Sequence, residues 1–578
     1  MRVKLRPDAH CTPTARGVYW SRADDAFVLA GPPTLYTVID DQLDALLDGT
    51  SLDAMVAAIG DERARPVLEH VLRTLISKDI LIDLDTAQGE IPDAETAREH
   101  PQLLAYLETH CAEPYLAFAA VRDARVAVIG SGPAADAARR GLAANGMTQD
   151  AENPTLAIVI DDCDDPVQLL DSPAALTAGT PVLPVVAAGE TALIGPVYAD
   201  VRELRGFQAV RERVIAWQRT GDEAAPARPV SAVLAGALAA DSVLGHLAGV
   251  GDGRRSALVV YGHAMQTRSI VVPEFVEDSA WLAEQIEDAL AATQADPASV
   301  EPSESTDTDT DTDLREVHRL AVGLTTRWTG TARWGRDLDL PQLPVSLTTL
   351  QSLTGPDAGQ AHFLGWGADR SAAGLTAVLG ALRHHVTTSA SDDEGAIAAA
   401  GLTRAHWWAD GLLRHTTPEA LEAPATTLAW DDLASGSVRE LWSLLEGYFD
   451  TPVILRTHTV PGLDWQTCVV AYAGSAETAA VEWGPSPLSA AYAALYAATA
   501  RAQFAAAEKT APQAPVSAAN RLNGTWALEI APYHQVHNCL RQLRERAQAA
   551  GAQPRAQRLL RDEAAGELSL VCGPVWLS

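Results

Sequence analysis

The sequence predicts a multidomain α/β protein, and three observations predict it. The chain has 578 residues, 47% of them hydrophobic, which is too long for one core and favours about three or four domains. Apolar, strand-like runs occur among segments with the i, i+3, i+4 spacing of amphipathic helices. Residues 296–313, DPASVEPSESTDTDTDTD, have almost no apolar content and cannot offset the entropy cost of ordering. We therefore expect an acidic disordered linker at 296–313 between two folded halves.

Charge and cysteine usage exclude several classes of partner. The formal net charge is −32, so the field of the chain repels nucleic-acid phosphates and anionic membrane surfaces. The start, MRVKLRPDAH, has no apolar segment of the signal-peptide type, and no uncharged run reaches the ~20 residues that span a bilayer. The six cysteines include no C-x-x-C pair, which argues against a disulfide framework and a cysteine zinc site. We expect a cytoplasmic protein with no nucleic-acid or membrane partner.

Residues 1–90 predict a small winged-helix domain. GVYW and AFVLAG are short β-prone runs, and three amphipathic helices follow before a closing strand, ILIDL. A DNA-binding winged helix needs a basic recognition helix. Here the third helix carries Arg65 and Arg73 but also Glu69, in a strongly acidic chain, so the charge argues against DNA binding.

An edge strand beside a helix can instead capture an extended peptide by strand addition. The segment 1–90 resembles the PqqD-like leader-recognition domains of enzymes that modify ribosomally made peptides. The resemblance implies that a leader peptide pairs with the edge strand containing Phe27, Val28 and Leu29. It also implies a groove lined by Leu68 and Leu72 on the third helix.

The segment DARVAVIGSGPAADAARRGLAANGM, residues 123–147, predicts a strand, a glycine turn at Gly130 and Gly132, and a helix, as in a dinucleotide-binding fold. The second strand, which should end in an acidic ribose ligand, is missing from the pattern. The cluster Asp161, Asp162, Asp164 and Asp165 has no lysine or arginine nearby to hold a phosphate. Nucleotide binding and a purely architectural sheet both remain open, and the latter is favoured.

Residues 91–295 resemble the ThiF-like domains of azole-forming peptide synthetases. The resemblance lies in VAVIGSGPAA, ETALIGPVYADVRELRGFQ, GALAADSVLGHLAG and TRSIVVPEF. In those relatives, cysteine pairs bind a structural zinc. This chain has Ala199 to Leu204 and Glu274 to Phe275 at the corresponding places, so we expect no zinc. The missing second strand also argues against a ThiF-type adenylating enzyme.

Residues 314–578 resemble a YcaO domain, the ATP-using cyclodehydratase of azoline biosynthesis, shortened relative to that family. The resemblance lies in TRWTGTARW, DLDLPQLPVSL and GPDAGQAHFLGWGADRSAAGLTAVLGALRHHV. In the family, a lysine, two glutamates and an arginine build the nucleotide and magnesium site. Trp366 stands in place of the lysine, Gly380 and Arg383 in place of the glutamates, and His384 in place of the arginine.

This substitution pattern predicts a degenerate nucleotide site without catalytic residues, metal or cofactor. A second helix at 485–504, PSPLSAAYAALYAATARAQF, has no acid either, and magnesium needs oxygen ligands. His534, His537 and Cys539 have metal-ligand types but match no catalytic zinc pattern. Trp407 and Trp408 are candidates for a contact patch.

Two functions fit this sequence. In the first, the chain is a pseudo-enzyme scaffold that binds the leader of a ribosomal precursor peptide and presents it to a separate YcaO cyclodehydratase or dehydrogenase in thiazole or oxazole formation. In the second, the chain is itself a fused ATP-dependent azoline-forming cyclodehydratase. The lack of carboxylates on 372–386 and 485–504 favours the first. A homodimer is left open.

Overall fold

The structure is a computed structural model. It describes residues 1–32, 34–162, 179–199, 204–219, 229–250, 256–261, 266–273, 280–291, 319, 321–335, 340–355, 358–389, 395–433, 436–475, 477–508 and 524–578. The predicted linker 296–313, the acids Asp164 and Asp165, and the pair Glu274 and Phe275 lie outside these residues.

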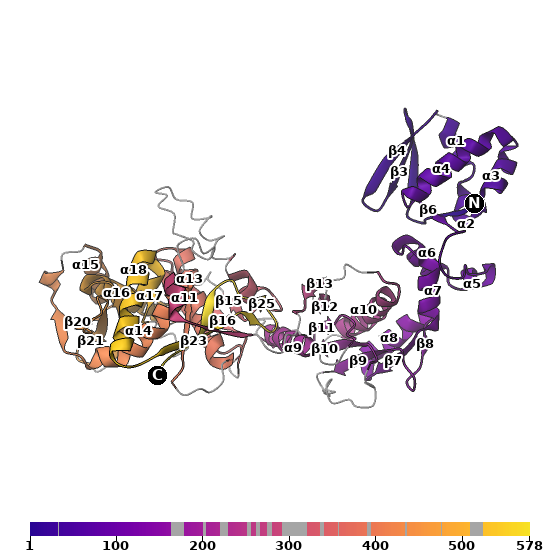
Figure 1. Ribbon diagram of the computed structural model, residues 1–578. Helices are drawn as coiled ribbons and strands as arrows, with labels where there is room; N and C mark the ends of the chain where they lie inside the picture. Colours follow the sequence, from indigo (N-terminus) through magenta and orange to yellow (C-terminus); the bar gives the residue numbers. More distant parts are fainter. Residues whose placement is uncertain are drawn as a thin grey trace. The chain divides into compact units, whose positions relative to one another are not determined.

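Contacts divide the chain into two compact units (Figure 1). The first unit is Met1–Leu204 with Ala225–Val271, and the second is Arg205–Ala224 with Val272–Ser578. The second unit therefore includes segments that precede the predicted linker. The domain boundaries drawn from the sequence remain a proposal.

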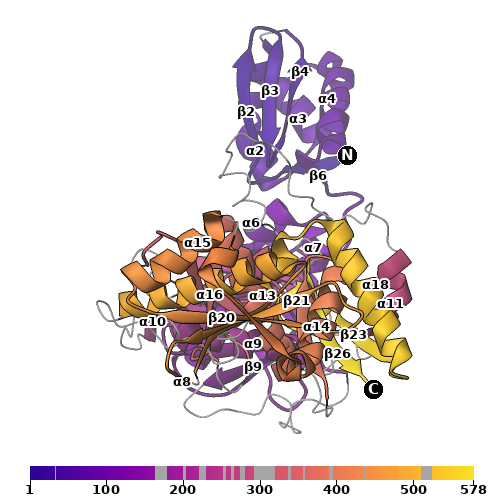
Figure 2. The same cartoon turned by 90° about the vertical axis from the view of Figure 1, so that its left-hand side faces the viewer.

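The N-terminal module of the first unit combines two three-stranded sheets, ordered β5-β1-β6 and β2-β3-β4, with helices α1 to α4 (Figures 1 and 2). The two predicted strands GVYW and AFVLAG are present as β3 and β4, whereas β2 was not predicted. Along β3, Val18 and Trp20 are buried and Tyr19 is exposed, as in a half-buried strand. The elements are β1 (Arg2–Leu5), β2 (His10–Thr14), β3 (Gly17–Arg22), β4 (Asp25–Ala30), α1 (Thr34–Asp40), α2 (Leu43–Asp48), β5 (Thr50–Ser51), α3 (Leu52–Ile59), α4 (Arg65–Ser77) and β6 (Leu81–Asp83).

A buried arginine ties this module to the helical connector that follows it. Arg6 donates from Nη2 and Nε to one oxygen of Asp79, Oδ1, at 2.8 and 3.0 Å, and from Nη1 to the carbonyl of Cys111 at 2.9 Å. Lys4 pairs with Glu108 at 2.7 Å. The Lys4–Glu108 pair and the Arg6 contact with Cys111 cross the module boundary, so we expect the module and connector to move together. The connector consists of α5 (Ala94–Glu99), α6 (Pro101–His110) and α7 (Pro114–Asp123).

The rest of the first unit is a seven-stranded sheet in the order β13-β12-β11-β10-β9-β7-β8. Strands β7, β8, β9 and β10 are parallel, as in a Rossmann-like sheet, and β11 to β13 continue antiparallel. The second strand that seemed missing is present as β8, which has only two residues and is therefore too short to leave a sequence pattern. The elements are β7 (Arg125–Ile129), α8 (Gly132–Ala144), β8 (Thr148–Gln149), β9 (Leu156–Asp162), β10 (Val182–Ala188), β11 (Thr191–Ile194), α10 (Pro229–Leu247), β12 (Ser256–Tyr261) and β13 (Gln266–Val271).

Helix α10 packs unusually closely on α8. A Cβ at Gly236 would lie 2.0 Å from the carbonyl oxygen of Ala134, and one at Gly141 would lie 2.7 Å from Ala240. Among the described helices, α10 alone is long and apolar enough to cross a membrane, with a mean hydropathy of 1.5 over Val230–Leu247. Helices in the core of a folded domain can have the same length and hydropathy. The close packing of α10 on α8 is typical of such a core helix.

The second unit contains sheets ordered β14-β23-β26-β18, β15-β16-β17 and β19-β20-β21-β22, with a β24-β25 hairpin. Its strands are β14 (Trp281–Glu284), β15 (Ala332–Trp334), β16 (Ser346–Ser352), β17 (His362–Gly367), β18 (Ile397–Gly401), β19 (Ala425–Leu428), β20 (Val453–Thr459), β21 (Gln466–Tyr472), β22 (Thr478–Gly484), β23 (Pro554–Leu559), β24 (Arg561–Asp562), β25 (Gly566–Glu567) and β26 (Val571–Leu577). Its helices include α9 (Leu204–Arg219), of which all but the first residue belong to this unit, and α11 (Ile286–Ala291), α13 (Arg370–Ser389), α14 (Arg404–Glu422), α15 (Gly436–Ser443), α16 (Pro487–Glu508), α17 (Trp526–Ile530) and α18 (Tyr533–Ala549).

Two long helices cover separate sheets of this unit. Helix α13 packs on β16 and β17, and α16 packs on β21 and β22. Trp407 and Trp408 of α14 are fully buried in the same core as Trp366. The expectation that they mark a contact patch is therefore wrong, because their rings fill the space between α14 and the sheets.

Helix α9 is tied to the second unit by polar contacts. Arg213 pairs with Asp562 at 3.1 Å and donates to the carbonyl of Thr329, while Trp217 donates to the carbonyl of Gly330. His385 also lies 3.2 Å from Asp562. The opposite charges around Asp562 hold the pKa of its carboxyl below the usual range despite burial, which by itself would raise it.

Candidate functional site

The first candidate site is the open edge of the sheet β2-β3-β4. Arg22 and Asp25 close a two-residue hairpin, and the amide of Gly31 donates to the carbonyl of Arg16. By the alternation of an antiparallel ladder, the main-chain groups of Ala26 and Val28 therefore point away from β3. No other described strand pairs with β4 on that side.

The two edges of this sheet differ in their capacity to accept another strand. On β2, the same alternation places Pro13, opposite Val18, with its nitrogen toward the outside. Proline has no N–H, so this edge lacks a donor and is blunted against strand addition. Strand β4 contains no proline and keeps its donors. Both views show α4 beside β4 (Figures 1 and 2).

The predicted peptide-binding residues differ in solvent exposure: two are accessible and three are buried. Phe27 is half-buried with the Lys78 ammonium 5.8 Å from its ring centre, and Val28 is 40% exposed. Leu29, however, is buried, and Leu68 and Leu72 are only 3% and 1% exposed. These three leucines hold the core of the module together and do not line an open groove in this structure.

An arginine of the following helix, α8, contacts the main chain of the glycine turn after β7. Gly130 and Gly132 have positive φ angles of 115° and 86°, and a Cβ at Gly130 would meet the carbonyl oxygen of Ile160 at 2.8 Å. Arg139 of α8 donates to the carbonyls of Val128 and Gly130 at 3.3 and 3.0 Å. Arg139 therefore lies at the glycine turn, whereas the sequence prediction of no nearby lysine or arginine concerned the acidic cluster at the end of β9. This arginine is engaged by the main chain of the turn.

The acids near this turn are also engaged or buried. Asp150, directly after β8, accepts hydrogen bonds from the amides of Glu152 and Asn153 at 2.8 and 3.1 Å. These bonds, rather than a ribose, hold the pKa of Asp150 below its usual value. Asp161 at the end of β9 is fully buried. The turn thus has the shape of a dinucleotide site with its polar groups used internally.

The second candidate site is the predicted degenerate nucleotide site in the second unit, and it begins at Trp366. This tryptophan on β17 is fully buried, with the Arg501 guanidinium 5.8 Å from its ring centre. Gly365 and Gly367 flank it because α13 lies so close: added Cβ atoms would come within 2.0 Å of the Ala373 carbonyl oxygen and 2.4 Å of the Ala372 side chain. These glycines serve helix packing.

Arg383 of α13 lies in a buried ion network with residues of α14. Its guanidinium is bidentate to Asp410, with Nε at 2.8 Å from Oδ2 and Nη2 at 3.2 Å from Oδ1. Asp410 also accepts from Arg414 at 2.8 Å, from the Ala400 amide at 2.9 Å and from the Thr525 hydroxyl. Burial alone would raise the pKa of Asp410, but the two arginine charges and these hydrogen bonds hold it at about 2.

Two further carboxyl groups lie deep in this unit. Glu482 on β22 accepts from the amides of Gly524 and Trp526 at 3.1 and 2.9 Å. Glu529 on α17 accepts from the Thr376 hydroxyl at 2.6 Å, and its other oxygen is buried and accepts no hydrogen bond from the described residues. Burial raises the pKa of both carboxyls to about 7, although the arginine charges and hydrogen bonds oppose it.

The space among these groups is small. A cavity of about 10 Å³ is lined by Arg383, Asp410, Thr525, Glu529 and their neighbours. Such a volume is about that of one water, whereas small-ligand sites typically measure ~300–1,000 Å³. Among the described residues, the network is a compact polar core with space for about one water.

The remaining residues of the predicted site do not join this network. Gly380 is buried within α13, and the His384 ring packs against Phe363 at 5.3 Å between centres. On α16, the Tyr496 ring stacks on Trp526 at 5.0 Å and an interplanar angle of 9°. Among the described residues, no group of three His, Cys, Asp or Glu side chains is placed to hold a metal ion. In the C-terminal motif, His537 contacts the Leu290 carbonyl at 2.8 Å and Cys539 is buried.

The sequence reasoning missed Asp410, Glu482 and Glu529. The YcaO resemblance implied carboxylate positions on α13 and α16, whereas these three acids lie on α14, β22 and α17. A signal was present, since each is a lone acid within an apolar run: WWADGLL, AAVEWG and WALEI. An isolated charge in such a run is buried with a partner or a function.

Comparison with known proteins gives a fold and no family. No family model and no curated protein matches the chain. A solved heterocyclase in complex with substrate and cofactor is similar over 100% of this chain and 94% of that chain, with a TM-score of 0.57 and 14% identity. The heterocyclase TruD gives 13% identity and a TM-score of 0.49 over the same shares. E. coli MccB with AMPCPP and MccA covers 48% of this chain and 99% of that chain, with 13% identity and a TM-score of 0.33.

At 14% identity the likeness to the first heterocyclase concerns the fold alone. It extends over the whole chain, and the structure is a mixed α/β arrangement with several sheets. The predicted multidomain α/β class is thereby confirmed. The assignment of each domain to a particular family stays a prediction.

We expect the buried glutamates to make stability fall as the pH rises from about 4.5 to about 7. In this window the folded chain keeps protons on Glu482 and Glu529 that the unfolded chain, with an ordinary pKa of 4.5, has released. One such group contributes a slope of up to about 1.4 kcal/mol per pH unit. Melting temperatures between pH 4.5 and 8 should show a shallower decline in Glu529→Gln than in the wild type. The exposed Glu422→Gln is the control, and parallel curves for both variants would contradict the assignment.

Proposed function

We propose that the chain is the leader-peptide-binding scaffold of an assembly that forms thiazole or oxazole rings in ribosomally made peptides. In this proposal it presents the precursor peptide to a separate YcaO cyclodehydratase or dehydrogenase and performs no chemistry itself. The observation that carries it is the open edge of β4 beside α4, with Pro13 blunting the opposite edge of the same sheet. The likeness in fold to a heterocyclase solved with its substrate supports a peptide partner.

The surface around the β4 edge has the properties that strand addition requires. The outward main-chain groups of Ala26 and Val28 can pair with an extended peptide. The exposed side chains of Val28 and Tyr19 oppose each other across β3 and β4 and give apolar contact. Lys78 forms no ion pair within the described part of the chain and can meet a carboxylate of the bound peptide.

The residues of the second unit do not fit magnesium and ATP, and this supports a scaffold over an enzyme. Arg383 is committed to Asp410, and Trp366 is buried beneath α13. Asp410 in turn is neutralised by two arginines, so it is a poor magnesium ligand. We derive no catalytic step through these residues.

Strand addition is tested by Val28→Pro. The proline removes an outward N–H and leaves the pairing of β4 with β3 intact, since Val28 does not bond β3. We expect a loss of affinity of about tenfold or more for the fluorescein-labelled leader of the cognate precursor peptide, measured by fluorescence anisotropy. Val28→Thr keeps the N–H and the β-propensity and should bind as the wild type does. Equal binding by both folded variants would place the leader elsewhere.

The second candidate is a fused ATP-dependent azoline-forming cyclodehydratase. The fold match over the full length of the chain favours it, as does the presence of Asp410, Glu482 and Glu529 in one unit. The cavity of about 10 Å³ among the polar groups argues against it. Assays of ATP binding and hydrolysis by the full chain separate the two candidates.

A further inference from the structure

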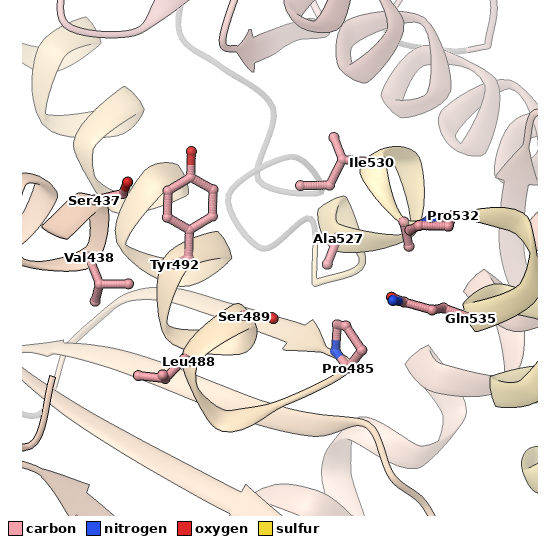
Figure 3. Close-up of a pocket in the computed structure, with 11 residues that line it drawn as sticks. Ser437, Val438, Pro485, Leu488, Ser489, Tyr492, Ala527, Ile530, Pro532 and Gln535 are labelled. Atoms are coloured by element: carbon pink, nitrogen blue, oxygen red, sulfur yellow. The ribbon is translucent and has the colours of Figure 1, made fainter. Parts of the chain in front are cut away.

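A pocket of about 360 Å³ lies on the second unit where α15, α16, α17 and α18 approach one another (Figure 3). Figure 3 shows Val438 on one side, Ala527, Ile530 and Gln535 on the other, and Tyr492 rising between them. The volume lies within the ~300–1,000 Å³ range of small-ligand sites. This pocket is distinct from the closed cavity around Arg383, since α17 turns Ala527 and Ile530 toward the pocket and Leu528 and Glu529 toward the cavity.

The described residues that line the pocket are all uncharged. Val438, Leu488 and Ile530 give apolar surface, and the polar groups are neutral: the Ser437 hydroxyl, the Gln535 amide and the Tyr492 hydroxyl. An anion that enters such a pocket loses its hydration without gaining a counter-charge. The lining therefore disfavours phosphates and carboxylates and suits an uncharged group.

One aromatic side chain, Tyr492, lines the pocket, and two buried aromatic rings lie behind it. The Tyr492 ring lies 5.5 Å from that of Tyr496 and 6.2 Å from that of Trp526, between ring centres. A flat ring that enters the pocket would extend this aromatic cluster, in the tilted or offset geometries that aromatic pairs prefer. Burial raises the pKa of the Tyr492 hydroxyl, which stays protonated and can donate a hydrogen bond at neutral pH.

We propose that this pocket binds an uncharged aromatic side chain of the precursor peptide, outside the leader. The identity of the peptide rests on the proposed function, whereas the ring specificity rests on the pocket. The rim supports a peptide as the source of the ring. Leu488 and Ile530 are exposed apolar side chains there and would contact the residues on either side of the inserted ring.

The test uses the full chain and N-acetyl-L-phenylalaninamide as the probe, observed by saturation-transfer difference NMR. We expect signals on the ring protons of this probe and none for N-acetyl-L-aspartate amide. Leu488→Asp should reduce the ring signals by at least about fivefold, because it places a charge at an apolar rim. An acid in the first turn of α16 is compatible with folding. Leu421→Asp on α14 is the matched control, since Leu421 is 41% and Leu488 37% exposed, and it should leave the signals unchanged.

Three results would overturn the proposal. Equal signals in the wild type and in Leu488→Asp would place the ring elsewhere. A response to adenosine monophosphate as strong as that to the phenylalanine probe would indicate a nucleotide pocket. A dimer that Leu488→Asp abolishes would indicate an interface between two copies of the chain. The probe carries no leader, so its failure is distinguishable from failure of the Val28→Pro titration, which reports on the N-terminal module alone.

Discussion

Asp410→Ala is expected to lower the stability of the second unit by about 3–5 kcal/mol, the typical cost of removing one partner of a buried ion pair. The carboxylate of Asp410 neutralises Arg383 and Arg414 and accepts the amide of Ala400. Without it, two positive charges and one N–H remain in a cavity of about 10 Å³ that cannot solvate them. The drop should appear as a lower melting temperature by tryptophan fluorescence, because much of the tryptophan of the chain lies in this core.

Glu422→Ala is the matched control for this measurement. Glu422 is an exposed acid at the end of the same helix, α14, and its removal should change the stability by less than about 0.5 kcal/mol. A second variant, Arg383→Met with Asp410→Leu, removes one charge of each sign and should cost less than Asp410→Ala alone. If Asp410→Ala were as stable as the control, the ion pair of Arg383 with Asp410 would not contribute to stability. The charge of Arg383 would then be available to a phosphate.

The full chain is expected neither to bind ATP with magnesium nor to hydrolyse it, even with precursor peptide present. Magnesium-dependent phosphoryl transfer needs oxygen ligands for the metal and cations near the phosphates. Here Arg383 is held by Asp410, and neither α13 nor residues 485–504 contain an acid. Calorimetry with ATP and magnesium should give no binding heat, and a phosphate-release assay should give no turnover above the blank.

The control for the ATP assay is the same mixture with the partner enzyme added, in which turnover should appear. Gly380→Glu with Arg383→Glu should not create activity, because Trp366 remains buried beneath α13 and Asp410 loses one of its arginines. Peptide-stimulated phosphate release by the chain alone would reject the scaffold and support the fused cyclodehydratase.

The sequence predicted those elements of the fold that carry a regular apolar pattern over several residues. Strands β3 and β4, helices α3 and α4, and the turn from β7 to α8 are of this kind. Strand β2, HCTPT, was missed because it is mostly polar and becomes a strand only by pairing with β3. Strand β8 was missed because two residues carry no period, and only its pairing with β7 defines it.

Only part of the candidate site was predictable, because the partners of its residues lie far away in the sequence. The substitutions at Trp366 and Arg383 were visible because they lie at places fixed by a motif. The partners of Arg383 were not, since Asp410 is 27 residues away and is itself bonded to Thr525, 115 residues further on. The burial of Leu68 and Leu72 likewise depends on tertiary packing. The apolar residues of an amphipathic helix have the same spacing whether they face the core or an open groove, so the sequence alone could not separate the two cases.

Two elements of the second unit, helix α9 and strand β14, are encoded before the acidic segment 296–313. Residues 205–219 and strand β14 both precede the acidic segment 296–313, yet α9 is bound to Asp562 and β14 pairs with β23 within the second unit. Dividing the gene at the acidic segment would give a first polypeptide that carries a helix and a strand belonging to the second. The second polypeptide would lack an edge strand and the arginine that balances Asp562. We expect each product to need the other for complete folding, so one continuous chain secures stoichiometry as well as proximity.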